Sequence, residues 1–303
     1  MHTRIDSLLE KCFRDGKIDA VHWIDEMPSP SFFGLQRRQN VLIATEGVEL
    51  LRMDYVRDKL PLKRLIYTYA IDSTNTTLKD LSLLHSIDQC LVTSECQLDG
   101  RGRRGKSWIS PFARNLAFTY GHAISKSKLK LGGVSLVVGL AVLEALTGLG
   151  AVNLKVKWPN DIVLGEQKIC GILVELLSKD DYVEVVIGIG INAELDHADR
   201  ESVERPVTDL RSVGVFESRN DVLIEVVRVL QQFLKKFNEI GFEPFVQAFN
   251  RSHIYHRKAC NVHQGDTIIT GRVEGVDVDG ALILSTENGI RSFHGGEVSL
   301  RAT

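Results

Sequence analysis

The sequence predicts a mixed α/β protein in three domains: a small N-terminal domain at 1–60, an α/β domain at 61–255 and a C-terminal β-barrel at 256–303. Three observations support this division. The first domain shows helical apolar spacing followed by two strand-like runs. The second alternates apolar runs typical of strands with amphipathic runs typical of helices. The third consists of short strand-like runs separated by Gly-Asp, Asp-Gly and Asn-Gly turns at hairpin spacing.

The N-terminal domain has the element order of a winged helix-turn-helix. The apolar spacing predicts one helix at 5–13, a second at 18–27 and a third at 31–40. Two strands at 41–44 and 48–51 would then form a hairpin. Nine basic and ten acidic residues leave this domain with a net charge of −1. Because phosphate contacts dominate affinity for DNA, this balance favours a structural domain and leaves DNA binding open.

The central domain is expected to contain a sheet covered by helices. Apolar runs predict strands at 64–70, 90–94, 115–122, 154–158, 169–177 and 182–191. Helices are expected at 75–84, after Gly133, and from Asn220, whose side chain would cap a helix with one apolar face. Glu144 and five glycines interrupt the apolar stretch 132–152, which therefore predicts a buried helix rather than a membrane span. In the C-terminal domain, strands are expected at 268–269, 281–284 and 290–293.

The composition excludes several classes of protein. The chain of 303 residues is 44% hydrophobic and 25% charged, which is ordinary for a globular protein with a sizeable core. A formal net charge of −2 argues against a general attraction to nucleic acid or anionic membranes. Five scattered cysteines without a C-x-x-C pair predict neither a disulfide framework nor a zinc site. With no apolar run of a signal peptide at the start, a cytoplasmic protein is expected.

The most unusual segment is residues 100–107, Gly-Arg-Gly-Arg-Arg-Gly-Lys-Ser, which we call the glycine–arginine loop. Glycine lets the backbone approach a ligand closely, and arginine forms bidentate hydrogen bonds with phosphate and carboxylate groups. A flexible cationic loop of this kind suits a site that handles phosphates and must open and close. A solvated basic loop or a nucleic-acid patch is the alternative.

The same loop also matches the P-loop pattern G-x-x-x-x-G-K-[ST]. A P-loop follows directly on an apolar strand and continues into a helix that faces the phosphates. Here residues 95–99 separate the predicted strand from the first glycine, and Pro111 would stop the helix. We therefore reject a P-loop.

Four motifs, taken in order, resemble the bacterial biotin protein ligases, in the form that can double as the biotin operon repressor. They are Asp72-Ser73-Thr74-Asn75; the glycine–arginine loop continuing to Pro111; Lys157-Trp158-Pro159-Asn160-Asp161 with 168–175; and Gly188 to Asn192. The C-terminal segment 295–301 matches a family motif as well. The resemblance covers about residues 64–303 and implies a class II synthetase-like catalytic domain and an SH3-like C-terminal barrel. It covers 1–60 only by architecture.

The resemblance implies that the protein activates biotin with ATP to biotinoyl-5′-AMP. It would then transfer biotin to a lysine of the biotin carboxyl carrier protein of acetyl-CoA carboxylase. The implied ligands are biotin, ATP and Mg²⁺, without a dedicated metal site in the protein. A homodimer is expected when ligand is bound, operator DNA stays an open partner, and no membrane is involved.

Three residues are expected to be catalytic: Arg103, Lys168 and Asp161. The transition state of adenylation gathers negative charge, so fixed cations should stabilise it. By resemblance, Arg101 and Arg103 contact the biotin carboxylate and the phosphate region, and Lys168 neutralises the mixed anhydride. Asp161 resembles the residue that helps the acceptor lysine attack, since a carboxylate can orient an amine and accept its proton.

The remaining site residues are implied in the same way. The biotin-binding set is Ser73, Thr74, Asn75, Gln97, Gly100, Arg101, Arg103 and Lys168. The ATP-binding set is Arg103, Trp108, Asn160, Asn192, Glu297 and Arg301. The uncharged ureido ring of biotin needs matched donors and acceptors, because unpaired buried polar groups are costly.

Each of these residues also has an ordinary structural interpretation. Ser73 and Thr74 are plausible helix caps, and Trp108 can be a packing residue. The two asparagines Asn160 and Asn192 can satisfy loop backbone, while Glu297 and Arg301 can form an exposed ion pair. Lys157 is expected to support a strand or the phosphate region.

Other functions stay open at this point. Lipoate-protein ligases share a related fold and also adenylate a carboxylate. A DNA-binding repressor is a second class, and a non-catalytic biotin sensor is a third. The complete set of Arg101, Arg103 and Lys168 argues against the sensor.

Overall fold

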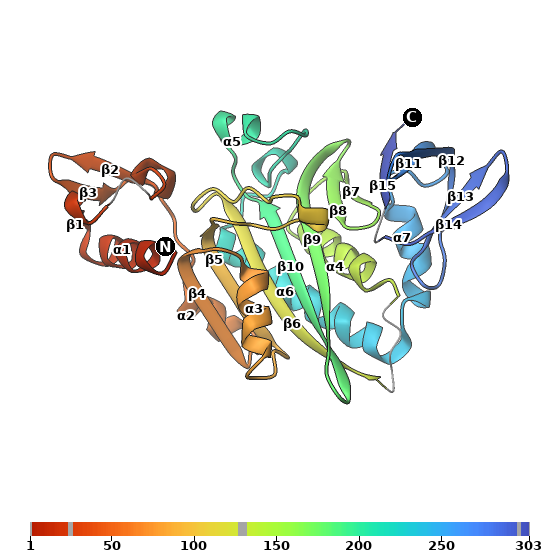
Figure 1. The fold of residues 1–303 in the computed structure, drawn as a ribbon, viewed down its shortest axis with the longest axis horizontal. Helices are drawn as coiled ribbons and strands as arrows, with labels where there is room; N and C mark the ends of the chain where they lie inside the picture. Colours follow the sequence, from red (N-terminus) through yellow and green to blue (C-terminus); the bar gives the residue numbers. More distant parts are fainter. Residues whose placement is uncertain (1, 24–26, 127–131, 296–297, 303) are drawn as a thin grey trace.

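A seven-stranded mixed sheet lies at the centre of the computed structural model, which describes residues 2–23, 27–126, 132–295 and 298–302 (Figure 1). The strands are β4 (Arg64–Ile71), β5 (Cys90–Gln97), β6 (Asn115–Ser125), β7 (Leu154–Lys157), β8 (Asp161–Leu164), β9 (Gln167–Ser178) and β10 (Tyr182–Asn192). Their order is β4-β5-β6-β10-β9-β8-β7, with β4 and β5 parallel and the other pairs antiparallel. This confirms the mixed α/β class. The sequence did not predict β8, which begins at Asp161, the last residue of the motif at 157–161.

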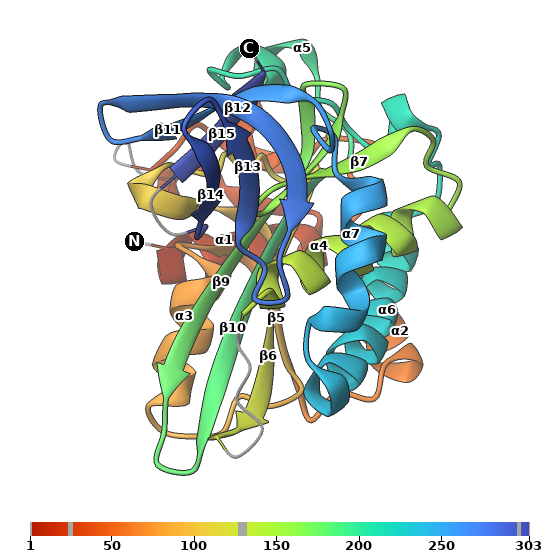
Figure 2. The ribbon, with the colours of Figure 1, turned by 90° about the vertical axis from the view of Figure 1, so that its right-hand side faces the viewer.

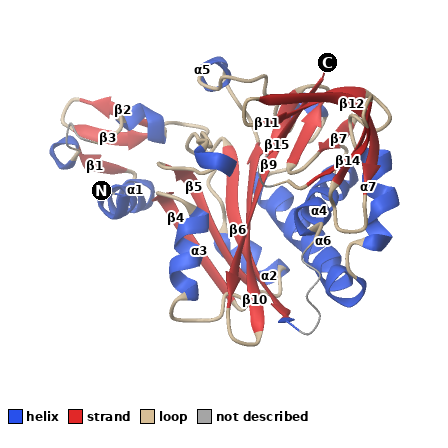
Figure 3. Cartoon of the chain, turned by 45° about the vertical axis from the view of Figure 1, so that its right-hand side comes forward, coloured by secondary structure: helices blue, strands red, loops and turns tan. Residues whose placement is uncertain are grey.

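Helices cover both faces of this sheet (Figures 2 and 3). The α-helices are α1 (His2–Asp15), α2 (Met53–Lys59), α3 (Thr74–Ser82), α4 (Val134–Gly148), α5 (His197–Glu201), α6 (Arg219–Ile240) and α7 (Val246–Ser252). Leu78 of α3 packs with Val92 and Val186 on one face. The neighbouring Leu91 and Ile187 point to the other face, into the core that α4 and α6 share.

α4 is apolar on nearly all sides because it lies between α6, α7 and the sheet. The stretch 132–152 therefore contains the buried helix that was predicted. Among the helices of the described residues, none combines the length and apolar character needed to cross a membrane. α6 begins after Ser218, whose side chain accepts the N–H of Asp221. The prediction that Asn220 is the cap was wrong, since Asn220 Oδ1 instead accepts the N–H of Arg52 at 2.7 Å.

The N-terminal part is a small unit of one α-helix, short 3₁₀ turns and a three-stranded sheet (Figure 1). After α1 come β1 (Lys17–Asp19), η1 (Ala20–His22), η2 (Pro30–Phe33), β2 (Leu35–Arg38) and β3 (Val41–Ala44). The sheet order is β1-β3-β2, and both pairs are antiparallel. The predicted first helix is confirmed.

The other two helices expected in this unit were wrong over the residues that the structure describes. Ile18 pairs with Leu42 across β1 and β3, and both are buried, so pairing with a distant strand overrides the helical spacing. The hairpin runs from Leu35 to Ala44 around Gln39, whose φ is 54°, and residues 48–51 form no strand. A winged-helix arrangement is therefore not confirmed in the described residues.

The N-terminal unit packs on β4, the edge strand of the central sheet. Asp6 Oδ1 accepts the backbone N–H groups of Tyr69 at 2.5 Å and of Ala70 at 3.2 Å. Phe13 stacks on Tyr69 and on Phe112, with ring centroids 5.7 and 5.6 Å apart. The unit therefore touches the residues that lead into the motif at 72–75 and those that leave the glycine–arginine loop.

The C-terminal residues form a five-stranded sheet and not the closed barrel that was expected. Its strands are β11 (Ala259–Gln264), β12 (Thr267–Val276), β13 (Leu282–Thr286), β14 (Gly289–Phe293) and β15 (Val298–Ala302). The order is β14-β13-β12-β11-β15, and within the described residues β14 and β15 do not pair. The buried side chains of this sheet, among them Val262, Val273 and Leu284, belong to the central core. Because the central domain covers this apolar face, the sheet does not need to close on itself.

Candidate active site

The sequence motifs meet at one end of the strands of the central sheet. Residues 72–75 follow β4, and the glycine–arginine loop follows β5. Asp161 begins β8 and lies opposite Gly171 of β9. Gly171 in turn lies opposite Gly190 of β10. The sheet register thus brings segments from four parts of the chain into one site.

The start of α3 faces Gln97 at the end of β5. The backbone N–H of Thr74 donates to Gln97 Oε1 at 2.9 Å, and the Thr74 hydroxyl lies 3.1 Å from the same oxygen. Ser73 holds the N-cap position, but its side chain makes no capping hydrogen bond to any described residue. The cap interpretation therefore does not account for the buried Ser73 hydroxyl.

The glycine–arginine loop folds back on itself beside this pair. The carbonyl of Gly100 accepts the N–H of Trp108 at 2.8 Å, and Gly102 N–H donates to the carbonyl of Lys106 at 2.6 Å. Arg103–Gly105 forms a single 3₁₀ turn, and the described residues that follow, up to Arg114, form no helix. This agrees with the rejection of a P-loop. Arg101 is half exposed and lies 3.5 Å from the Asp99 carboxylate.

Arg103 connects the loop to the motif at 157–161. Its Nη1 donates to Asn160 Oδ1 at 3.0 Å, and Asn160 Nδ2 donates to the carbonyl of Ile172 at 2.8 Å. Burial and the neighbouring Arg104 lower the pKa of the Arg103 guanidinium, while Asp161 raises it. An arginine side chain nevertheless stays protonated in proteins. Arg103 is therefore a half-buried cation directed toward the centre of the site.

Lys168 and Asp161 form the central ion pair. Lys168 Nζ lies 2.6 Å from Asp161 Oδ1, and the two side chains are 12% and 18% exposed. Arg205 Nη1 approaches the other carboxylate oxygen at 3.7 Å. Lys168 Nζ also lies 5.5 Å from the centre of the Trp108 ring. Two cations thus flank one carboxylate next to an aromatic ring.

The Trp108 ring lies flat against two glycines of the sheet. A Cβ at Gly190 would be 2.5 Å from Trp108 Cε2, and a Cβ at Gly171 would be 3.1 Å from Trp108 Cζ3. The indole N–H is buried without a hydrogen-bond partner in the described residues. The motif glycines therefore provide the space that the indole occupies.

Asn192 fixes the segment that follows β10. Its buried Nδ2 donates to the carbonyl of Thr208 at 3.0 Å and to that of Lys168 at 3.3 Å. The side chain thus satisfies loop backbone, which was the alternative to a nucleotide contact. Lys168 also bonds this segment through its backbone, since its N–H donates to Pro206 and its carbonyl accepts from Thr208, both at 3.0 Å.

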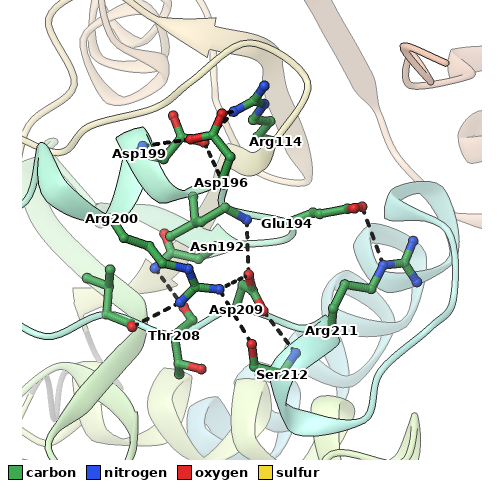
Figure 4. A network of polar contacts seen from close by, with 12 residues as sticks. Arg114, Asn192, Glu194, Asp196, Asp199, Arg200, Thr208, Asp209, Arg211 and Ser212 are labelled. Carbon is green, nitrogen blue, oxygen red and sulfur yellow. Dashed lines mark hydrogen bonds and ion pairs between the residues drawn. The ribbon is translucent and has the colours of Figure 1, made fainter.

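Figure 4 shows how charged residues hold this segment, residues 193–213, against the site. Arg200 Nη2 lies 2.5 Å from Asp209 Oδ2, and Arg114 pairs with both Asp196 and Asp199. Asp209 also accepts the N–H of Leu195 at 3.0 Å. These bonds bring the segment beside Lys168.

The C-terminal sheet approaches the site at the motif 157–161. Arg301 lies on β15, exposed and opposite Asn261 of β11, and Glu297 lies outside the described residues. A Cβ at Gly295 would be 3.0 Å from Pro159 Cβ, so the chain just before β15 touches the motif at 157–161. Lys157 pairs with Glu166 at 3.0 Å. This contact fits the expected supporting role.

Among the described residues, no three or more His, Cys, Asp or Glu side chains gather as a cation site would require.

Two sequence families match this chain. The family described as "Biotin/lipoate A/B protein ligase family" matches residues 67–192, and "Biotin protein ligase C terminal domain" matches residues 258–301. The first includes ligases for either acid, so it does not separate biotin from lipoate.

Individual relatives distinguish between the two acids. The "Bifunctional ligase/repressor BirA" proteins of Salmonella typhimurium and Escherichia coli are each 34% identical over 85% of this chain and 80% of their own length. The chain belongs to the biotin protein ligase family. The "Biotin--[acetyl-CoA-carboxylase] ligase" of Paracoccus denitrificans is 31% identical over 75% of this chain and 96% of its own length.

A solved biotin protein ligase has the same fold. The enzyme from Aquifex aeolicus, in complex with biotin and ATP, is 32% identical, covers 80% of this chain with all of its own, and has a TM-score of 0.69. For a chain of this ligase family, the meeting of the four motifs at one end of the strands of the central sheet therefore marks the candidate active site.

Several polar residues beside the candidate active site of this biotin protein ligase were not predicted from the sequence. Thr119 and Glu175 contact Asn75, Lys79 pairs with Glu175, and Arg205 approaches Asp161. Glu175 ends the motif segment 168–175, which was a weak signal that it belongs to the site. Thr119, Lys79 and Arg205 lie in none of the motifs, and they are recognisable only when the fold brings their strands and loops together.

Proposed function

We propose that this protein is a biotin protein ligase. It activates biotin with ATP to biotinoyl-5′-AMP and transfers biotin to a lysine of the biotin carboxyl carrier protein of acetyl-CoA carboxylase. The observation that carries the proposal is the group of Arg103, Asp161 and Lys168 beside Trp108, in a chain 34% identical to ligases of this type. Its location would be the cytoplasm.

In this proposal biotin lies with its ureido ring toward Ser73, Thr74 and Gln97. Thr74 occupies Gln97 Oε1, so the Gln97 amino group faces the opposite way and is able to donate to a carbonyl of the ligand. The valeryl carboxylate then extends toward Arg101 and Arg103, whose guanidinium groups suit carboxylate and phosphate.

Adenylation joins a biotin carboxylate oxygen to the α-phosphorus of ATP and breaks the bond to pyrophosphate. Arg103 and Lys168 stabilise the negative charge that develops there, because both are cations held in place, Arg103 half-buried and Lys168 only 12% exposed. Trp108 and Asn160 are proposed to contact the nucleotide, with Asn192 acting through the loop that it holds. Roles for Arg301 and Glu297 in ATP binding stay predictions.

In the transfer step the carrier lysine attacks the carbonyl carbon of the mixed anhydride. A C–N bond forms, the bond from carbon to the phosphate oxygen breaks, and AMP leaves. Asp161 would accept the proton of the amine, because its carboxylate lies 2.6 Å from Lys168 Nζ, the group proposed to face the anhydride phosphate.

Magnesium would enter bound to ATP. The described residues do not form a carboxylate cage for it, and Mg²⁺ commonly takes most of its ligands from substrate phosphates and water. Neither adenylation nor the transfer of biotin, as proposed, depends on a metal held by the protein.

The proposed activity is tested by incubating the protein with ATP, Mg²⁺ and a purified carrier domain, with either biotin or lipoate. Mass spectrometry of the carrier should show a mass increase of one biotinyl group and none for lipoate. A lipoyl adduct without a biotinyl adduct would make the protein a lipoate ligase.

A change at Gly190 should affect the nucleotide more than biotin. In Gly190→Ala the new methyl group meets the Trp108 ring at 2.5 Å, so the indole must move. Overpacking of this kind costs about 1–3 kcal/mol, and we expect the KM for ATP to rise about tenfold or more. Steady-state kinetics at saturating biotin measures it. Gly148→Ala, where a Cβ meets nothing within 4 Å, is the matched control, and equal ATP kinetics in the two variants would contradict the role of Trp108.

Repressor activity is the second candidate function. The curated relatives named "Bifunctional ligase/repressor BirA" favour it, whereas the net charge of −1 over residues 1–60 does not. A gel shift at low salt on the DNA upstream of the organism's own biotin genes, with and without biotin and ATP, is decisive. If the protein does not shift the DNA at low salt, repressor activity is excluded and ligase activity is the only function proposed.

We propose a homodimer in the ligand-bound state, which sedimentation with and without biotin and ATP would test.

We also propose that the catalytic domain begins near residue 50 instead of 61, because Leu51, Val56 and Leu60 pack in the central core.

A further inference from the structure

A polar cluster lies directly behind the residues proposed to bind biotin. It consists of Asn75 and Lys79 of α3, Thr119 of β6 and Glu175 of β9, and we call it the Asn75 cluster. Asn75 and Thr119 are 5% and 0% exposed. The side chains of Lys79 and Glu175 are 29% and 31% exposed. Three separate elements thus contribute to one polar group within the domain.

The side chain of Asn75 is fully used by these neighbours. Its Nδ2 donates to Glu175 Oε2 at 2.9 Å and to the carbonyl of Leu173 at 3.4 Å. Its Oδ1 accepts the hydroxyl of Thr119 at 2.6 Å. Both amide hydrogens and the amide oxygen therefore have protein partners. Asn75 was expected to bind biotin directly, whereas in the structure its polar atoms are all bonded to protein groups.

Glu175 decides which way the Asn75 amide points. Burial raises the pKa of Glu175, but the hydrogen bonds from Lys79 and Asn75 outweigh it and hold the pKa below its usual value. An ionised carboxylate only accepts hydrogen bonds. The amino group of Asn75 must therefore face Glu175, and its oxygen must face Thr119. Lys79 Nζ, 2.6 Å from Glu175 Oε1, occupies the second carboxylate oxygen.

The Asn75 cluster connects to the proposed biotin contacts through Thr119. The Thr119 hydroxyl gives its single hydrogen to Asn75 Oδ1 and therefore accepts the hydrogen of Thr74 Oγ1, 2.8 Å away, while the Thr74 N–H donates to Gln97 Oε1 at 2.9 Å. Gly188 of β10 packs so closely on Asn75 Oδ1 that a Cβ there would overlap it. The first turn of α3 is thus held against the sheet by this cluster.

We propose that Glu175 is a positioning residue for biotin. By fixing the Asn75 amide, it holds the N-terminus of α3, with Ser73 and Thr74, in the position that receives the ureido ring. Asn75 supports the site from behind without touching the ligand, and Lys79 holds the Glu175 carboxylate in place. This inference rests on the proposed biotin-ligase function.

Glu175→Gln separates this role from ordinary packing, because it keeps the shape and removes the charge. Lys79 attracts the oxygen of the introduced amide, which turns its amino group toward Asn75. The Asn75 amide then reverses, and its oxygen faces the Leu173 carbonyl without a hydrogen between them. We expect the KM for biotin in adenylation to rise about tenfold, with kcat and the KM for ATP changed less than about threefold.

A second substitution should rescue the first. In the double variant Glu175→Gln, Lys79→Met the cation is gone, so the introduced amide is free to offer its oxygen to Asn75. We expect the KM for biotin to return to within about threefold of wild type. A merely structural role predicts the opposite, since two changes in one cluster would then add their losses.

Steady-state pyrophosphate exchange with varied biotin measures all of these variants, and thermal melting records their stability. Glu225→Gln is the matched control, because it removes a carboxylate from an exposed pair with Arg228 on α6. A wild-type KM for biotin in Glu175→Gln, or a double variant worse than the single one, would overturn the inference. Wild-type protein that does not adenylate biotin at all would instead refute the proposed function.

Discussion

Lys168→Ala is expected to lower the rate of biotinoyl-5′-AMP formation by about 10²- to 10³-fold. Lys168 Nζ lies 2.6 Å from Asp161 and is only 12% exposed, so its charge acts where water cannot replace it. Removing it takes a cation from the developing phosphate charge and leaves Asp161 with Arg205 at 3.7 Å as its nearest cation. Single-turnover formation of the adenylate from biotin and ATP measures the effect.

Lys157→Ala is the matched control for this experiment. It removes the same charge from the same motif, but Lys157 pairs with Glu166 and lies over the ring of Tyr255, 5.2 Å from its centre. We expect it to change the adenylation rate by less than about fivefold, as for a partly exposed ion pair. Equal rates in both variants would remove Lys168 from the mechanism while leaving the fold in place.

Arg219→Ala is expected to lower the free energy of unfolding by about 3–5 kcal/mol, because it leaves a buried carboxylate without its cation. Glu95 is fully buried, and its Oε2 lies 2.7 Å from Arg219 Nη2. Its Oε1 accepts the N–H of Leu51 at 2.6 Å and the hydroxyl of Tyr67 at 2.8 Å. Burial and Glu95 also raise the pKa of Tyr67 far above its usual value, so that hydroxyl stays a donor.

Urea denaturation followed by circular dichroism measures this loss. Arg228→Ala on the same helix removes an exposed pair with Glu225, and it should change stability by at most about 0.5 kcal/mol. The double variant Glu95→Gln, Arg219→Met should recover part of the loss, because no uncompensated charge remains. A loss below about 1 kcal/mol in Arg219→Ala would show that water reaches Glu95 and compensates the pair.

The residues of the candidate site were predictable where the chemistry resides in a motif. Arg103, Asn160, Asp161 and Lys168 were chosen because they lie in motifs that resemble those of the family, and the structure brings all four together. The role of Asn75 was not predictable in the same way. Its direction is set by Glu175, 100 residues further along the chain, and nothing near Asn75 in the sequence indicates that partner.

The N-terminal unit shows the same limit for the fold. The apolar spacing at 18–27 fits a helix, yet Ile18 lies in a strand because it pairs with Leu42. The turn at Gln39 and Asn40 then places the hairpin at 35–44, earlier in the chain than the predicted hairpin of strands 41–44 and 48–51. Local propensity is a weak signal in short segments, so a distant partner strand decides between helix and strand.

The sequence by itself determined the mixed α/β class, the long strands, the buried apolar helix α4 and the motifs of a biotin protein ligase. These properties follow from residue type and spacing within a few turns or strands. Tertiary structure alone decided the open C-terminal sheet, the pairing of Glu95 with Arg219 across 124 residues, and the Asn75 cluster. The physical reason is that a buried charge or an apolar sheet face takes whichever partner the fold brings near, and the distance along the chain carries no information about that partner.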